Sequence, residues 1–74
     1  MAPRSAVDVI RDASRIYLVD AEDIRGPKRD ARTCEARFAV IAALSDMGWS
    51  STRIGSLLNR HHTAVLYALG RLAK

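Results

Sequence analysis

The stretch SSTRIGSLLNRHHTAVLYALGRL, residues 50–72, carries two short helical patterns on either side of a polar turn. Ser50 or Ser51 is suited to cap the first helix, because a serine hydroxyl accepts a hydrogen bond from an amide at a helix start. Asn59 is suited to the turn, because asparagine adopts the left-handed backbone conformation more readily than most residues. A last helix is predicted from about His61 to Leu72. The inward residues predicted for the two helices are Ile54, Leu57, Leu58, Val65, Leu69 and Leu72.

Two short helices joined by a tight turn, the second more basic than the first, form the outline of a helix-turn-helix. Gly55 stands where the two helices must approach closely. The same apolar spacing would also serve an ordinary helical hairpin. The outward face of the last helix favours the helix-turn-helix, since its first residues would enter a major groove and meet base edges and phosphates. That face holds Arg60, His61, His62, Thr63, Ala64, Tyr67 and Arg71.

The rest of the sequence predicts three more helical segments and no strand. A first helix of about four turns follows Ser5, a short turn of helix follows Asp20, and a long buried helix runs from Asp30 to Gly48. Gly26 and the proline after it end the short turn and leave a basic loop at residues 25–29. The inward positions expected are Ala6, Val9, Ile10, Ala13, Ile16, Tyr17, Cys34, Ala36, Phe38, Val40, Ile41, Ala43, Leu44 and Met47. We therefore expect an all-α fold and a single domain over residues 1–74.

Length and composition exclude several classes of protein. A chain of 74 residues is near the lower limit for a core without metals or disulfides. Cys34 is the sole cysteine, so neither an intramolecular disulfide nor a cysteine-rich zinc fold is available. The longest apolar run, residues 38–44, is too short to span a bilayer, and the first residues lack the apolar block of a secretion signal. A cytoplasmic protein without a membrane partner is expected.

The charge is distributed unevenly. Residues 1–24 carry three basic and five acidic side chains, residues 25–37 carry five basic and two acidic ones, and residues 47–74 carry four basic and no acidic ones. Such asymmetry favours a polyanion as partner, with a merely solvated basic face as the alternative.

The histidine pair and the cysteine do not form a convincing reactive site. A metal site would need His61, His62 and Cys34 to converge, yet neighbours on a helix point about 100° apart. Cys34 shares a stripe with Phe38 and Ile41, which indicates a packed thiol and not a nucleophile. We predict no metal, no cofactor, no small-molecule substrate and no enzymatic activity.

The segment IGSLLNRHHTAVLYAL (54–69), with ARFAVIAAL (36–44) and DIRGPKRDAR (23–32) before it, resembles the C-terminal DNA-binding domain, domain IV, of the bacterial replication initiator DnaA. The most specific part is RHHTAVLYA (60–68) against the family's RDHTTVLHA. The resemblance covers about residues 9–72. It implies a Trp-repressor-like helical fold that reads an asymmetric double-stranded DNA site as a monomer.

Carried over residue by residue, the resemblance gives the site. His62 and Thr63 would contact bases in the major groove, and Arg60 would contact the backbone. His61, next to them, is also expected at a base edge. Arg29 matches the arginine that enters the adjacent minor groove. The further phosphate contacts expected, from the resemblance for Arg37 and from charge for the others, are Arg37, Lys28, Arg53, Arg25 and Arg32.

The sequence departs from the family at three places. His61 replaces an aspartate, which exchanges an acceptor for a neutral or cationic ring and should change the preferred DNA sequence. A purely structural role for His61, as a cap of the last helix, is the alternative. Asn59 stands where the family usually has a glycine pair, so the turn is one residue shorter. Ala64 replaces a threonine and removes one hydroxyl.

There is no G-x-x-x-x-G-K-[ST] phosphate loop and no room for an ATPase module. Met1 and the capped first helix favour a natural N-terminus, and hence a transcription regulator or the first domain of one, for instance of phage or prophage type. Two alternatives stay open. One is an excised DNA-binding domain of a replication initiator, and the other, from a different class, is a protein–protein interaction module.

Overall fold

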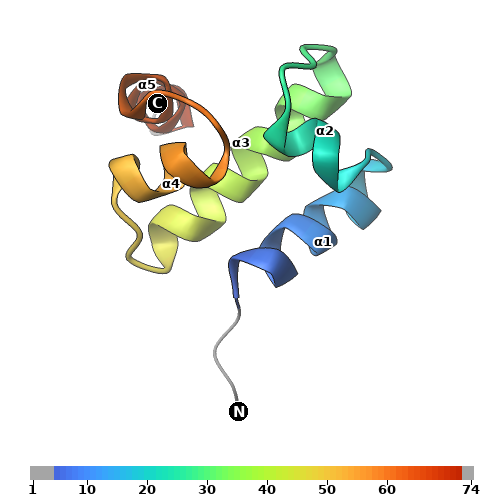
Figure 1. Ribbon diagram of the computed structural model, residues 1–74, viewed down its shortest axis with the longest axis horizontal. Coiled ribbons are helices and arrows are strands. Elements are labelled where there is room, and N and C mark those ends of the chain that lie inside the picture. The colour runs from blue at the N-terminus through green and yellow to red at the C-terminus, as the bar shows by residue number, and fades with distance from the viewer. Residues whose placement is uncertain (1–4, 73–74) are drawn as a thin grey trace.

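Five α-helices follow one another along residues 5–72, the part of the chain that the computed structural model describes (Figure 1). They are α1 (Ala6–Tyr17), α2 (Ala21–Arg25), α3 (Ala31–Asp46), α4 (Ser51–Leu57) and α5 (His62–Leu72). Helix α3 runs through the middle, with α1 and α2 packed on one part of it and α4 and α5 on another (Figure 1). No strand is present in residues 5–72, so the all-α prediction is confirmed.

Side-chain caps begin three of the helices, and the sequence predicts two of these caps, at Ser5 and at Ser50 or Ser51. The Ser5 hydroxyl accepts a hydrogen bond from the Asp8 amide at 3.2 Å, while the Asp8 carboxylate accepts from the Ser5 amide at 3.3 Å, which forms a capping box. Asp30 accepts from the Thr33 amide at 3.1 Å and begins α3. Ser50, and not its neighbour, caps α4. Asp20 is the N-cap residue of α2, but its side chain makes no capping hydrogen bond. The side-chain cap predicted for Asp20 is therefore not formed.

Residues with a left-handed backbone conformation follow α1, α3 and α4. The sequence predicts the two that follow α3 and α4. Gly48 has φ +92° after α3, and Asn59 has φ +55° after α4. Leu18, with φ +57°, ends α1 in the same way. A leucine is an unusual choice for this conformation, and nothing in the local sequence signals it.

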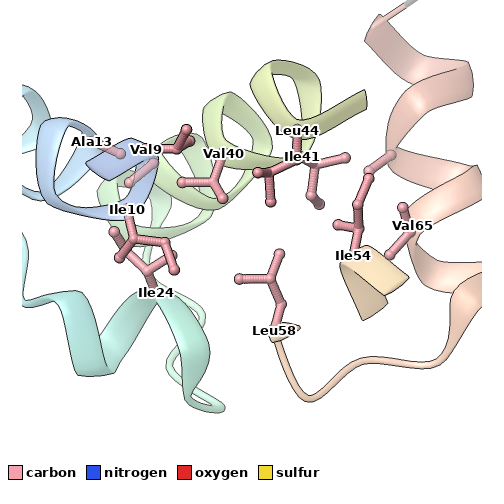
Figure 2. Close-up of a cluster of buried hydrophobic side chains, with 12 residues drawn as sticks. Val9, Ile10, Ala13, Ile24, Val40, Ile41, Leu44, Ile54, Leu58 and Val65 are labelled. Carbon is pink, nitrogen blue, oxygen red and sulfur yellow. The ribbon is translucent and has the colours of Figure 1, made fainter. Parts of the chain in front are cut away.

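One apolar cluster draws side chains from all five helices. Figure 2 shows Ile24 of α2 beside Ile10 of α1, and Leu58, which follows α4, lying below α3. Ile54 faces Val65 across the contact of α4 with α5 (Figure 2). The buried members are Val9, Ile10, Ala13, Ile24, Ala36, Val40, Ile41, Leu44, Ile54, Leu58, Val65 and Ala68. The side chain of Leu72, predicted to point inward, lies outside the described residues.

Two predicted core residues are exposed instead. Ile16 is 73% exposed although it continues the apolar stripe of α1. The facing positions of α3 are Ala39 and Ala43, whose short side chains leave an open hollow of about 240 Å³ that Ile16 lines without filling. Met47 is 41% exposed because α3 ends at the preceding residue.

No helix within residues 5–72 combines the length and the apolar character that a bilayer crossing requires.

Candidate nucleic-acid interface

Gly55 of α4 lies in close contact with the backbone of the turn that leads into α5. A Cβ atom on Gly55 would lie 2.6 Å from the carbonyl oxygen of Arg60, and the Arg60 amide donates to the Gly55 carbonyl at 2.8 Å. Only a residue without a side chain fits this contact. The close approach predicted for Gly55 is confirmed, and it fixes how α5 leaves the turn.

The first turn of α5 presents its side chains to solvent. His61, His62, Thr63 and Ala64 are all exposed, while Val65 and Ala68 point into the core. The residues predicted to meet bases in the major groove, His61, His62 and Thr63, therefore lie together on one accessible edge. Further along α5, Leu66 is 52% exposed and Tyr67 is 70% exposed, so two large side chains extend this face. Leu66 was not predicted to be there.

His61 caps α5. Its Nδ1 accepts a hydrogen bond from the Thr63 amide at 3.3 Å and lies 2.8 Å from the Thr63 hydroxyl. Its ring also lies against the ring of His62, with the centroids 4.3 Å apart. The capping role that the sequence left as an alternative for His61 is thus present in the structure.

Hydrogen bonds join the basic loop to the turn between α4 and α5. Arg25 donates through Nε to the Leu57 carbonyl at 3.1 Å, and the Asn59 carboxamide donates to the Arg25 carbonyl at 3.2 Å. Arg60 donates to the Gly26 carbonyl at 2.6 Å. The loop therefore sits beside the start of α5, although the bonded residues are more than thirty positions apart in sequence.

Arg37 lies inside the protein and is only 7% exposed. Its guanidinium donates to four backbone carbonyls, those of Asp23, Ile24, Gly26 and Lys28, at distances of 2.8 to 3.1 Å. These oxygens include carbonyls at the end of α2, which have no partner within the helix. The phosphate contact expected for Arg37 is corrected by this placement, because its donors are directed inward and hold the loop.

The signal for a buried Arg37 was present in the sequence. The buried positions of α3 are Thr33, Ala36, Arg37, Val40, Ile41 and Leu44. They follow the spacing of one helical face, and Arg37 is a member of that series. An arginine on an apolar stripe indicates a buried group with polar partners.

Arg60 is half-buried, and its guanidinium donates to backbone carbonyls of both the basic loop and the turn before α5. Besides Gly26, it donates to the carbonyls of Leu58 and Asn59 at 3.1 and 3.4 Å. Burial, followed by the positive charges of Arg37 and Arg29, lowers the pKa of Arg60. The junction of loop and turn is therefore a concentration of positive charge, with Arg60 as a structural link within it.

The remaining expected contacts are on the surface. Arg29 and Arg32 are exposed, and Arg53 is exposed with its guanidinium 3.8 Å from the centroid of the Trp49 ring. Lys28 is exposed as well, but it lies 3.6 Å from a carboxylate oxygen of Asp23 and 3.9 Å from one of Asp30. These exposed ion pairs are weak, so Lys28 remains available to an anion.

Within residues 5–72, no three histidine, cysteine or acidic side chains gather into a group that could hold a metal ion. Cys34 is a half-buried free cysteine, with its sulfur 3.8 Å from a guanidinium nitrogen of Arg37.

The all-helical fold agrees with that of a known family. Residues 7–71 match the helix-turn-helix of the bacterial DnaA protein. No curated protein matches the chain. Because the matched region spans nearly the whole sequence, the chain belongs to the family of bacterial DnaA helix-turn-helix domains.

Proposed function

We propose that this protein binds double-stranded DNA in a sequence-specific manner, with α5 in the major groove and the basic loop in the adjacent minor groove. Its family is one of DNA-binding domains and not of enzymes. We further propose that it acts as a monomer on an asymmetric site, as a transcription regulator or the DNA-binding part of one.

The observation that carries the proposal is the bonding of the loop to the turn before α5. Three side-chain hydrogen bonds, from Arg25, Asn59 and Arg60, hold the two segments together. Because each segment is basic and exposed, a duplex lying across them would meet both at once. The fixed spacing between them supports simultaneous reading of two neighbouring grooves.

The residues proposed to contact DNA divide into two roles. His62 and Thr63 lie on the accessible first turn of α5 and would contact base edges, and Arg29 would enter the minor groove. The residues proposed to contact phosphates are Lys28, Arg25, Arg32, Arg53 and Arg60. Phosphate contacts position a protein on DNA, and base contacts give it specificity.

Selection of bound duplexes from a random pool, followed by fluorescence anisotropy on the recovered site, tests the proposal. Arg29→Ala should weaken binding to that site by roughly ten- to a hundredfold. Arg15→Ala removes the same charge from α1, where Arg15 is exposed, and should change the affinity by less than about twofold. Equal losses for the two variants would refute a specific role for the loop.

The salt dependence separates DNA binding from a protein interaction module. Affinity for duplex should fall steeply as salt rises, because binding releases cations from the phosphates and a higher salt concentration makes that release less favourable. Absence of duplex binding at low salt would favour the protein interaction module. A recovered site resembling the initiator box would favour a replication role over transcription.

A further inference from the structure

Two contacts join His61 to Thr63 at the start of α5. Nδ1 of His61 lies 3.3 Å from the Thr63 backbone nitrogen and 2.8 Å from the Thr63 hydroxyl oxygen. A backbone N–H can only donate, so Nδ1 must be an unprotonated acceptor, and the proton of the neutral ring must sit on Nε2. The Thr63 hydroxyl can then only donate to Nδ1.

This arrangement determines what the hydroxyl offers to the outside. A threonine hydroxyl has one hydrogen and two acceptor lone pairs, and here the hydrogen is directed toward His61. We propose that His61 is a positioning residue that fixes the exposed Thr63 hydroxyl as a hydrogen-bond acceptor toward DNA. The inference rests on the proposed function, and it names the chemistry that one of its base contacts would select.

An acceptor in the major groove pairs with only two of the four bases. Adenine N6 and cytosine N4 carry amino hydrogens there, whereas guanine and thymine present acceptors at the corresponding positions. Thr63 therefore selects adenine or cytosine on the strand that it faces. Without the His61 acceptor the hydroxyl can rotate, so that it donates as readily as it accepts and the selection is lost.

Three variants isolate the acceptor from the shape of the site. His61→Asn loses the ring but retains an acceptor, because Oδ1 of asparagine occupies the place of Nδ1 along the side chain. His61→Phe retains the ring against His62 but has no acceptor. Thr63→Val retains the branched shape of threonine and removes the hydroxyl.

Sites are selected from a random duplex pool at pH 8, where an ordinary imidazole is neutral. The position at which Thr63→Val loses its base preference identifies the base read by the hydroxyl. There, the unsubstituted protein and His61→Asn should prefer adenine or cytosine by about three- to tenfold, the effect of one hydrogen bond. His61→Phe should lose the preference at that position and keep it elsewhere. Guanine or thymine at that position, or an unchanged preference in His61→Phe, would overturn the proposal.

A second measurement does not depend on DNA. In the free protein, the 15N chemical shifts of the His61 ring should show the tautomer with its proton on Nε2. A predominant Nδ1–H tautomer overturns the inference whatever the DNA results. If circular dichroism shows that His61→Phe does not fold, the tautomer measurement alone tests the inference. Failure of the unsubstituted protein to bind any duplex would instead refute the proposed function.

Discussion

Replacement of Gly55 by alanine tests whether the close contact of α4 with the turn determines the stability of the fold. The added Cβ would lie 2.6 Å from the Arg60 carbonyl oxygen, well inside ordinary van der Waals contact. Because the facing atom belongs to the backbone, no side chain can rotate away, and the turn itself must move. That movement also strains the 2.8 Å hydrogen bond from the Arg60 amide to the Gly55 carbonyl.

Two opposing effects set the magnitude. Overpacking of this kind costs about 3 kcal/mol, the upper end of the usual range, because the obstructing group is backbone. Alanine favours a helix over glycine by about 1 kcal/mol, which offsets part of the cost. The net loss in the free energy of unfolding should be about 2 kcal/mol, equivalent to a fall in Tm of roughly 8 to 16 °C for a domain of this size.

Gly70→Ala is the matched control. Gly70 also lies within a helix, and a Cβ there would have no atom within 4 Å. This variant should gain about 0.5 to 1 kcal/mol from helix propensity alone. Urea denaturation followed by circular dichroism at 222 nm measures both variants. If Gly55→Ala proves as stable as the unsubstituted protein, the close contact does not constrain the fold and the reasoning fails.

Three further predictions concern the loop, acid stability and the reading helix. Arg37→Met should lower the free energy of unfolding by about 2 to 4 kcal/mol, because four carbonyls lose a charged donor, whereas Arg32→Met on the surface should change it by less than about 0.5 kcal/mol; urea denaturation distinguishes them. Hydrogen bonds from the Thr33 hydroxyl and amide lower the pKa of Asp30, so its carboxylate stabilises the fold above its ordinary value near 3.8, and this contribution is lost as the pH falls through the lowered pKa. Asp30→Asn should therefore flatten the acid limb of a stability profile measured from pH 2 to 7, and an unchanged limb would contradict this. His62→Ala should weaken binding to the selected site by about 1 to 3 kcal/mol and binding to random duplex very little, as measured by anisotropy, and equal losses would exclude base reading.

Most of the fold could be predicted from the sequence by rules that involve only neighbouring residues. Ser5, Asp30 and Ser50 begin helices because their side chains accept amide hydrogen bonds a few residues away, which sequence alone can indicate. Gly48 and Asn59 have the left-handed conformation for equally local reasons. The exposed His62 and Thr63 followed from the periodicity of the last helix.

Features that depend on contacts between distant segments could not be predicted in this way. The bond from Arg25 to Leu57 joins residues 32 positions apart, and no local pattern announces it. Ile16 stays exposed because of small residues on another helix, which the pattern of its own helix cannot reveal. The family resemblance led us to expect a phosphate contact for Arg37, although the helical periodicity of α3 already indicated that Arg37 is buried.

The manner in which Arg37 holds the loop affects how easily this protein could acquire a new target. Its four hydrogen bonds to the loop and the end of α2 go to backbone carbonyls, which every amino acid supplies, so this support of the loop does not depend on the side chains at positions 28 and 29. Those side chains can be exchanged while the loop keeps its course. A library of variants at these positions, built on an unchanged Arg37, would separate the evolution of minor-groove preference from the maintenance of the fold.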